Sequence, residues 1–212
     1  MRNLKKLVAC FALMFALVVT SVTSFAADSP SGQKFGDVSF KSDVTAYTYN
    51  TFQKKPTVTV LGADGKALVK GTDYKVTYKN NVAAGTATAI ITGIGAYAGQ
   101  TKELTYSIAK AYPRAYINKG GATKRTLTPL KTKDRNLGRI KFYVMNGSKY
   151  KLLDETMNVT YSSSDSKNVK VDKNGNVTVA KKAKKGTYTI TIKIKASSNF
   201  RGTTRKTTVV VK

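Results

Sequence analysis

The segment 169–192, VKVDKNGNVTVAKKAKKGTYTITI, decides the fold of this chain. Val alternates with polar residues on both sides of the turn Asp172-Lys173-Asn174-Gly175, which is the pattern of two half-buried strands joined by a tight hairpin. Asn-Gly is a strong hairpin signal because both residues tolerate positive φ. After the lysine-rich stretch 181–185, Thr187–Ile192 alternates Thr with larger apolar residues and predicts a third strand.

The same alternation continues on both sides of this segment. Gly, Asn, Asp and Lys clusters interrupt it roughly every 8–12 residues, and no long helical apolar period follows the first 26 residues. The pattern predicts an all-β sandwich of short antiparallel strands. The expected strands are Val44–Tyr49, Thr57–Leu61, Tyr74–Tyr78, Thr86–Thr92, Leu104–Ile108, Gly138–Met145, Met157–Ser162, Val169–Val171, Val177–Ala180, Thr187–Ala196 and Arg205–Val211.

Two parts of the chain repeat the same order of landmarks. Gly85-Thr86-Ala87-Thr88-Ala89-Ile90 matches Gly186-Thr187-Tyr188-Thr189-Ile190-Thr191, and Tyr97-Ala98-Gly99 matches Phe200-Arg201-Gly202. In each copy a closing strand follows the aromatic-x-Gly turn, so we predict two related modules. The expected organisation is a flexible lead at 27–36, module 1 at 37–110, a connector at 111–125 and module 2 at 126–212.

Module 1 contains a long ordered motif. It consists of Pro56-x-Val58-x-Val60, Leu68-x-x-Gly71-x-Asp73-Tyr74-x-Val76-x-Tyr78-x-Asn80-Asn81, Gly85-Thr86-Ala87, Gly93-x-Gly95-x-Tyr97-x-Gly99 and Tyr106-x-Ile108. In this motif, residues 44–108 resemble the immunoglobulin-like repeats of secreted and surface proteins of Gram-positive, clostridia-like bacteria. One departure is the Tyr-x-Gly that these repeats have before the first Pro, which is Tyr49-Asn50-Thr51 here.

Module 2 carries a different motif. It consists of Val159-Thr160-Tyr161-Ser162-Ser163-Ser164-Asp165, Val169-x-Val171-Asp172-x-x-Gly175-x-Val177 and Lys185-Gly186-Thr187-Tyr188-x-Ile190-x-Ile192. Residues 126–212 therefore resemble a group 2 bacterial immunoglobulin-like domain of the intimin and invasin type. Together the resemblances imply two tandem immunoglobulin-like β-sandwich modules that serve as stalks, spacers or adhesion units, without shared catalytic residues.

The first 26 residues have the three parts of a secretory signal peptide. Basic residues precede an apolar core at Leu7–Val22, and Ser24-Phe25-Ala26 supplies small residues for cleavage after Ala26. We therefore expect a secreted, extracellular protein, with cell-wall association as a further hypothesis and no transmembrane segment in the mature chain. A lipid anchor on Cys10 is an alternative, although its Leu7-Val8-Ala9-Cys10 motif precedes most of the apolar core.

Composition argues against catalysis. Cleavage removes the only Cys, and the chain has no His, so the mature protein lacks a thiolate nucleophile, a Cys-ligated metal and the commonest general base. No His is present to activate Ser162–Ser166, and Asp172-x-Asn174-x-Asn176 lacks the further acidic ligands of a calcium loop. We predict no enzyme, no cofactor and no metal site. A Ser/Lys dyad stays open, as does a Lys–Asn isopeptide bond, which would need a buried acid such as Glu103 or Glu155.

The charge is concentrated in the second half of the chain. Residues 27–110 hold 10 basic and 6 acidic residues, whereas residues 111–212 hold 24 basic and 5 acidic residues, a net charge of +19. Such a charge favours polyanionic partners, although outward lysines also protect strands from aggregation. The candidate polyanion-binding residues are Lys124, Arg125, Lys131, Lys133, Arg135, Arg139, Lys141, Lys181, Lys182, Lys184, Lys185, Lys193, Lys195, Arg201, Arg205 and Lys206.

These observations predict a non-catalytic surface or secreted protein that binds an anionic cell-envelope polymer through module 2. Teichoic acid or an acidic polysaccharide is the expected partner, and a glycan of a host or neighbouring cell is an alternative one. The export signal argues against nucleic acid as the main ligand. Two other functions stay open: a carbohydrate-recognition accessory of a polysaccharide-degrading system, and a structural spacer whose charge only aids solubility.

Overall fold

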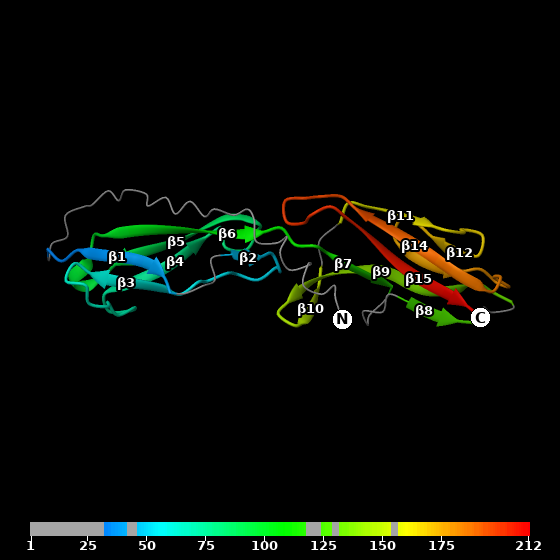
Figure 1. Cartoon of the computed structure of the whole chain (residues 1–212), viewed down its shortest axis with the longest axis horizontal. Coiled ribbons are helices and arrows are strands. Elements are labelled where there is room, and N and C mark those ends of the chain that lie inside the picture. The colour runs from blue at the N-terminus through cyan, green and yellow to red at the C-terminus, as the bar shows by residue number, and fades with distance from the viewer. Residues whose placement is uncertain (1–31, 42–45, 118–123, 129–131, 154–156) are drawn as a thin grey trace, which may run out of the picture. The chain divides into compact units, whose positions relative to one another are not determined.

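The computed structural model describes residues 32–41, 46–117, 124–128, 132–153 and 157–212. The predicted signal peptide lies outside these residues. The described chain is all-β, with one short 3₁₀ helix at Gly95–Tyr97 (Figure 1). The predicted all-β fold class is confirmed, since the described strands form several sheets; the signal peptide that belongs to this prediction stays an expectation. Among the described residues, no helix is long and apolar enough to cross a membrane.

By its internal contacts the chain divides into two compact units. Unit 1 comprises Met1–Phe40, Val58–Thr77 and Ala89–Thr105, and unit 2 comprises Lys41–Thr57, Tyr78–Thr88 and Tyr106–Lys212. The division differs from the module boundaries expected from the sequence, which stay a prediction. We call strands β1–β6 the first sandwich and strands β7–β15 the second sandwich; the second lies entirely within unit 2.

The first sandwich contains a two-stranded sheet, β1-β3, and a four-stranded sheet in the order β2-β6-β5-β4. Its strands are β1 (Phe35–Phe40), β2 (Ala46–Thr48), β3 (Val58–Gly62), β4 (Tyr74–Lys79), β5 (Gly85–Gly93) and β6 (Thr101–Ala109). Strand β1 was not predicted, and it begins inside the stretch 27–36 that we expected to be a flexible lead. It pairs antiparallel with β3, and Phe35 at its start is buried against Tyr97, with ring centroids 5.7 Å apart.

The turn predicted at 172–175 and two further turns have the backbone that their residues favour. Gly65, Asn80 and Gly175 all have positive φ, at 77°, 54° and 79°. Thr51, which stands where the repeats that module 1 resembles have Gly, also has a positive φ, of 73°. The turn therefore keeps the left-handed conformation although a β-branched residue occupies it, and that conformation is strained for Thr.

The second sandwich contains two sheets. In the five-stranded sheet β10-β9-β13-β12 are neighbours and β7 also pairs with β9; the four-stranded sheet has the order β11-β14-β15-β8. The strands are β7 (Arg114–Ile117), β8 (Lys124–Leu127), β9 (Arg135–Asn146), β10 (Lys149–Leu152), β11 (Val159–Ser163), β12 (Val169–Val171), β13 (Asn176–Val179), β14 (Gly186–Ile194) and β15 (Thr203–Val211). Strands β14 and β15 pair along their whole length, from Gly186–Val211 to Ile194–Thr203.

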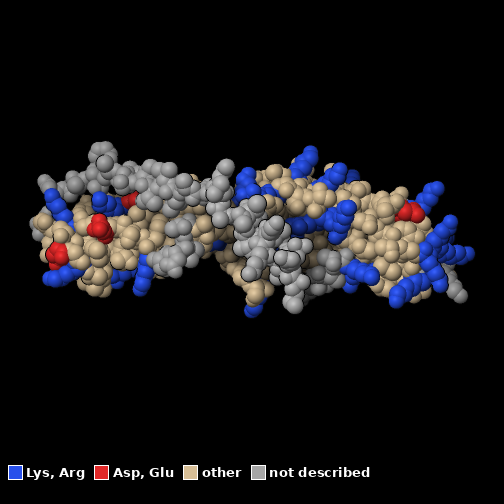
Figure 2. Space-filling model, viewed as in Figure 1, with Lys and Arg blue, Asp and Glu red and all other residues tan. Residues whose placement is uncertain are grey.

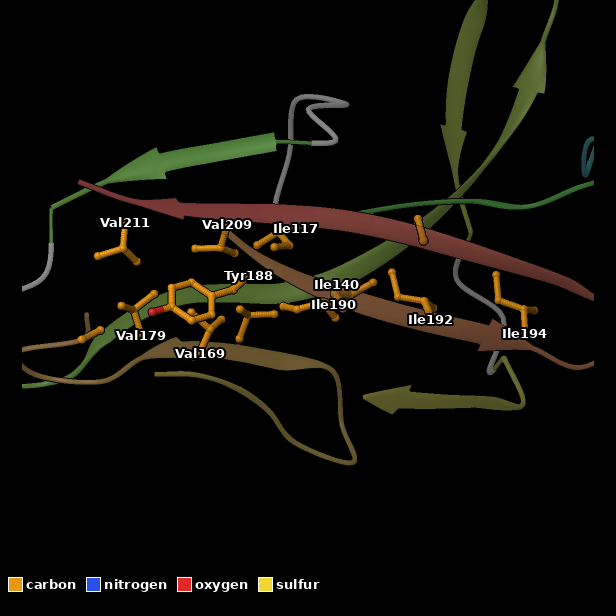
Figure 3. Close-up of a cluster of buried hydrophobic side chains, with 13 residues drawn as sticks. Ile117, Ile140, Val169, Val179, Tyr188, Ile190, Ile192, Ile194, Val209 and Val211 are labelled. Atoms are coloured by element: carbon orange, nitrogen blue, oxygen red, sulfur yellow. The ribbon is translucent and has the colours of Figure 1, made fainter. Parts of the chain in front are cut away.

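The core of the second sandwich lies between its sheets (Figure 3). Val169, Val177 and Val179 enter it from the β12–β13 hairpin and Ile190 from β14, and all are fully buried. This is the arrangement that the alternation in 169–192 predicts, because every second side chain of a strand lies on the same face. The opposite side chains of these strands are left for the surface.

The stretch 111–125, which we expected to be a connector, contains strand β7 and the start of strand β8. Strand β7 pairs with β9 and buries Ala115, Tyr116 and Ile117, while β8 begins at Lys124 and pairs parallel with β15. Pro113 stands just before β7 and therefore leaves the ladder between β7 and β9 intact. Residues 114–117 and 124–125 of this stretch therefore belong to strands of the second sandwich.

Candidate functional site

The predicted cationic residues do not form one patch. Within the described residues they are distributed over the outer face of one sheet, the rim of a hollow, a loop and the start of β15. Lys131 lies outside the described residues. Figure 2 shows Lys and Arg side chains gathered near the C-terminal end of β15, with few acidic side chains on that face.

In the four-stranded sheet of the second sandwich, β11-β14-β15-β8, strict alternation determines which side chains lie on the outer face. In β14, Ile190 and Ile192 are buried, so Thr191 and Lys193 lie on the opposite, outer side. The outer positions carry Thr, Ser or Lys except for Val210, and none of them carries Asp or Glu. We call this surface the threonine–lysine face: Thr160 and Ser162 of β11, Thr187, Thr189, Thr191 and Lys193 of β14, Thr204, Lys206, Thr208 and Val210 of β15, and Lys124 and Thr126 of β8.

Strand register places three lysines of this face on a diagonal. Lys193 pairs with Thr204, which stands two residues before Lys206 on β15. Lys124 pairs with Thr208, two residues after Lys206. Each step therefore moves one strand across and two residues along, which separates successive Cα atoms by about 8 Å in a regular sheet. Lys193, Lys206 and Lys124 form what we call the lysine diagonal, and all three are exposed.

The lysine-rich loop between β13 and β14 has a fixed backbone and free side chains. The Lys181 amide donates to Asp134 Oδ1 at 2.9 Å, and the Lys184 amide donates to Asn168 Oδ1 at 2.7 Å. Ala183 is buried, whereas the loop lysines, Lys181, Lys182, Lys184 and Lys185, are exposed. The loop therefore presents its charges from a defined position.

Arg139 and Lys141 lie at a hollow of about 460 Å³ in the second sandwich. Apolar residues including Phe142 and Leu153 also line it. Arg139 is held in place because its Nε donates to Asn174 O at 2.8 Å. Burial raises the pKa of the Tyr161 phenol in the lining, while Arg139 acts in the opposite direction. The other lining residues are Ile140, Leu152, Met157, Val159, Lys173 and Asn174.

The remaining predicted arginines are less available. Arg205 is half-buried and donates through Nε to Pro113 O at 3.0 Å. The Arg201 guanidinium lies over the Tyr112 ring, with its Cζ 5.5 Å from the centroid. Arg125 and Arg135 are half-buried, and Lys133 and Lys195 are exposed.

The described acidic residues of the second sandwich serve its turns. Asp165 accepts the amides of Lys167 and Asn168, and Asp172 accepts those of Asn174 and Asn176. Hydrogen bonds from the Asn168 and Asn176 side chains, followed by those from the amides, hold the pKa of Asp165 and Asp172 below the usual value. Asp134 accepts the amide at the start of the lysine-rich loop.

Asp134, Asp165 and Asp172 accept backbone amides and form no ion pair with another described residue. Among the described residues, the lysines and arginines of the second sandwich therefore have no ion-pair partner. The one ion pair in the described ranges joins Lys66 Nζ to Asp64 Oδ2 at 3.3 Å, in the first sandwich. The lysines and arginines of the second sandwich are therefore not neutralised by ion pairs within these ranges.

In the described part of the chain, no group of three or more His, Cys, Asp or Glu side chains that could hold a metal ion comes together. Lys54 is buried, which lowers its pKa, and its Nζ donates to Asn50 Oδ1 and to Phe52 O. Glu103 is exposed and is not the buried acid of an isopeptide bond; Glu155 lies outside the described residues.

Sequence reasoning missed two features of this surface. Lys173, on the rim of the hollow with Arg139 and Lys141, was taken only as part of a turn. The Thr content of β14 and β15 was used as a strand signal, although the outward positions in the same alternation were already a hint of a hydroxyl-lined face.

Comparison with known proteins gives similarity of fold alone. No family model and no curated protein matches the chain. A protocadherin GammaB4 extracellular domain is 12% identical over 85% of this chain and 34% of that one, with a TM-score of 0.32. Clostridium thermocellum CbhA fibronectin(III)-like modules are 13% identical over 83% of this chain and 94% of that one, at 0.24. Domains 4–9 of surface layer protein SbsC are 14% identical over 84% of this chain and 31% of that one, at 0.25. Likeness at these TM-scores carries no argument about function.

Proposed function

We propose that this chain is a non-catalytic, exported surface protein of a Gram-positive type of cell, and that its second sandwich holds it to an anionic polymer of the envelope. The observation that carries the proposal is the set of exposed lysines and arginines without ion pairs in the described second sandwich. A module with a net charge of +19 over residues 111–212 attracts polyanions at long range and gains affinity by releasing their counterions.

Export is the second part of the proposal. The N-terminal residues have the order of a secretory signal, and cleavage after Ala26 would deliver a chain without Cys to the cell exterior. The anionic polymer that a Gram-positive surface offers is wall teichoic acid. Resemblance of the second module to adhesin-type immunoglobulin-like domains is compatible with this role.

A salt-wash series on intact producing cells tests the proposal. Release of the protein at moderate ionic strength is expected, because exposed charge pairs are screened over about 10 Å at 0.1 M salt. Retention at molar salt, or no association at low salt, would contradict electrostatic binding. Pull-down of residues 27–212 on purified wall fractions, with and without teichoic acid, then identifies the polymer. Salt-independent binding to neutral glycans would favour the carbohydrate-accessory function, and no binding to any fraction would favour the spacer.

A further inference from the structure

Protection of edge strands against pairing with other chains does not account for the lysine diagonal. Lysines on edge strands prevent sheets from pairing with other chains. In the order β11-β14-β15-β8, however, Lys193 and Lys206 lie on the two central strands, and only Lys124 lies on an edge strand. Lys193 and Lys206 therefore protect no edge, and like charges at about 8 Å spacing repel one another, which favours a function beyond solubility.

The groups between the lysines limit the chemistry of a ligand. Thr191 and Thr208 flank Lys206 on the sheet, and further threonines extend the surface in both directions. In the described part of the chain, no hydrogen bond engages the hydroxyl groups of the threonine–lysine face. Each hydroxyl both donates and accepts, so a ligand that has hydroxyl or ether oxygens between its negative charges matches the whole face.

Other polyanions match the face less well. It has no aromatic side chain, whereas proteins that bind single-stranded nucleic acids stack the bases on aromatic rings. Its only apolar position is Val210, so it has no apolar surface to insert into a membrane.

We propose that the threonine–lysine face binds a polyol-phosphate polymer of the teichoic-acid type, with successive phosphates on Lys193, Lys206 and Lys124 and the polyol units on the intervening threonines. The inference rests on the proposed function and adds the place of binding and the class of polymer. The loop lysines contribute long-range attraction without direct contact.

A pair of charge-matched variants tests the place of binding. The face variant is Lys124→Gln/Lys193→Gln/Lys206→Gln, and the loop variant is Lys181→Gln/Lys184→Gln/Lys185→Gln. Both remove three exposed positive charges from the second sandwich. Binding of residues 27–212 to purified wall teichoic acid is measured as a function of salt concentration, and thermal unfolding of each variant confirms that it is folded.

The expected difference is in the salt slope. Each lost phosphate contact lowers the slope of log K against log salt by roughly 0.7 for a single-stranded polyanion, so the face variant should lose about 2 units of slope. The loop variant should keep the wild-type slope. Equal effects of the two variants would overturn the proposed face while leaving electrostatic binding intact; a wild-type protein that does not bind teichoic acid would overturn the proposed function as well.

Two further experiments test the class of polymer: removal of threonine hydroxyls and competition by other polyanions. Thr191→Val/Thr208→Val preserves shape and β-propensity, and should lower affinity about three-fold to ten-fold per hydrogen bond lost, with the salt slope unchanged. Unchanged affinity would refute the role of the hydroxyls. Inorganic polyphosphate, single-stranded DNA and anionic phospholipid vesicles, each at equal charge concentration, should compete less well than teichoic acid. Equal competition by any of them would refute the polyol-phosphate assignment.

Discussion

Substitution of Gly175 by Ala tests how the turn at the centre of the second sandwich is held. Gly175 has a φ of 79°, and a Cβ built there would lie 2.9 Å from both Cζ and Oη of Tyr161. Gly147, in the β9–β10 turn of the same sandwich, has a φ of 59° and nothing within 4 Å of such a Cβ. The two substitutions therefore share a backbone cost and differ in the steric clash.

The expected losses in the free energy of unfolding differ between the two variants. A non-glycine residue in the left-handed region costs about 1–2 kcal/mol, and loss of the flexible glycine from the unfolded chain returns about 0.4–1 kcal/mol. Gly147→Ala should therefore lower the free energy of unfolding by about 1 kcal/mol. Gly175→Ala should add an overpacking cost of about 1–3 kcal/mol, for a total of roughly 2–4 kcal/mol.

Urea unfolding of residues 27–212, followed by far-UV circular dichroism, measures both variants. With a urea slope of about 1–3 kcal/mol/M, Gly175→Ala should lower the midpoint by roughly 1 M or more and Gly147→Ala by about a quarter to a half of that decrease. A double-mutant cycle with Tyr161→Ala completes the test, because removal of the ring should reduce the Gly175→Ala penalty to that of Gly147→Ala. Equal penalties in the wild-type background, or an unchanged Gly175→Ala penalty without the ring, would refute the packing of Tyr161 on the turn.

Four further predictions concern stability. Thr51→Gly should stabilise the protein by about 0.5–1 kcal/mol in urea unfolding, because relief of left-handed strain exceeds the added flexibility of the unfolded chain; destabilisation would contradict the strain. Ile190→Ala should cost about 2–5 kcal/mol because the side chain is fully buried, and a loss below 1 kcal/mol would place it outside the core. Burial raises the pKa of Tyr106 from 10.0 to about 12, so its contribution to stability is complete below pH 10 and should fall by up to roughly 3 kcal/mol as pH rises through 12; Tyr106→Phe should remove this decrease in an alkaline unfolding series. Hydrogen bonds lower the pKa of Asp172 below 3.8, so its contribution is present above pH 3.8 and lost as pH falls through the folded-state pKa; Asp172→Asn should flatten that part of an acid unfolding curve.

Strands with strong alternation were predictable from the sequence, and strands without it were not. Val169–Val171 was predicted with its observed bounds, and Thr187–Ala196 overlaps almost all of β14, because alternate burial gives a strand of a sandwich its period of two. Strand β10 has four exposed residues and no buried face, so no such period marks it. Strand β8 is held by parallel pairing with β15, a contact between distant segments that local pattern does not reveal.

The outward position of lysines in alternating strands was predictable from the sequence, but the surface that they form together was not. Alternation alone predicts that Lys193 lies outward, since Ile192 and Ile194 on either side are apolar. Its neighbours on the sheet are fixed by register with β15 and, beyond it, by β8. From the sequence, lysines can be grouped only by their nearness along the chain. The lysine diagonal instead joins positions 124, 193 and 206, which are far apart in the sequence.

The positions of the acidic residues help to explain why the second sandwich is so basic. If the lysines served only solubility, interspersed acids would serve it equally well, and a mixed surface is the usual solution. Instead, the described acids Asp134, Asp165 and Asp172 all accept backbone amides at turns. Their positions are fixed by the needs of the fold, and none stands on the threonine–lysine face. Acids are thus retained where the backbone requires an acceptor and are absent from the sheet surface, as expected of a surface whose negative charge is supplied by a ligand.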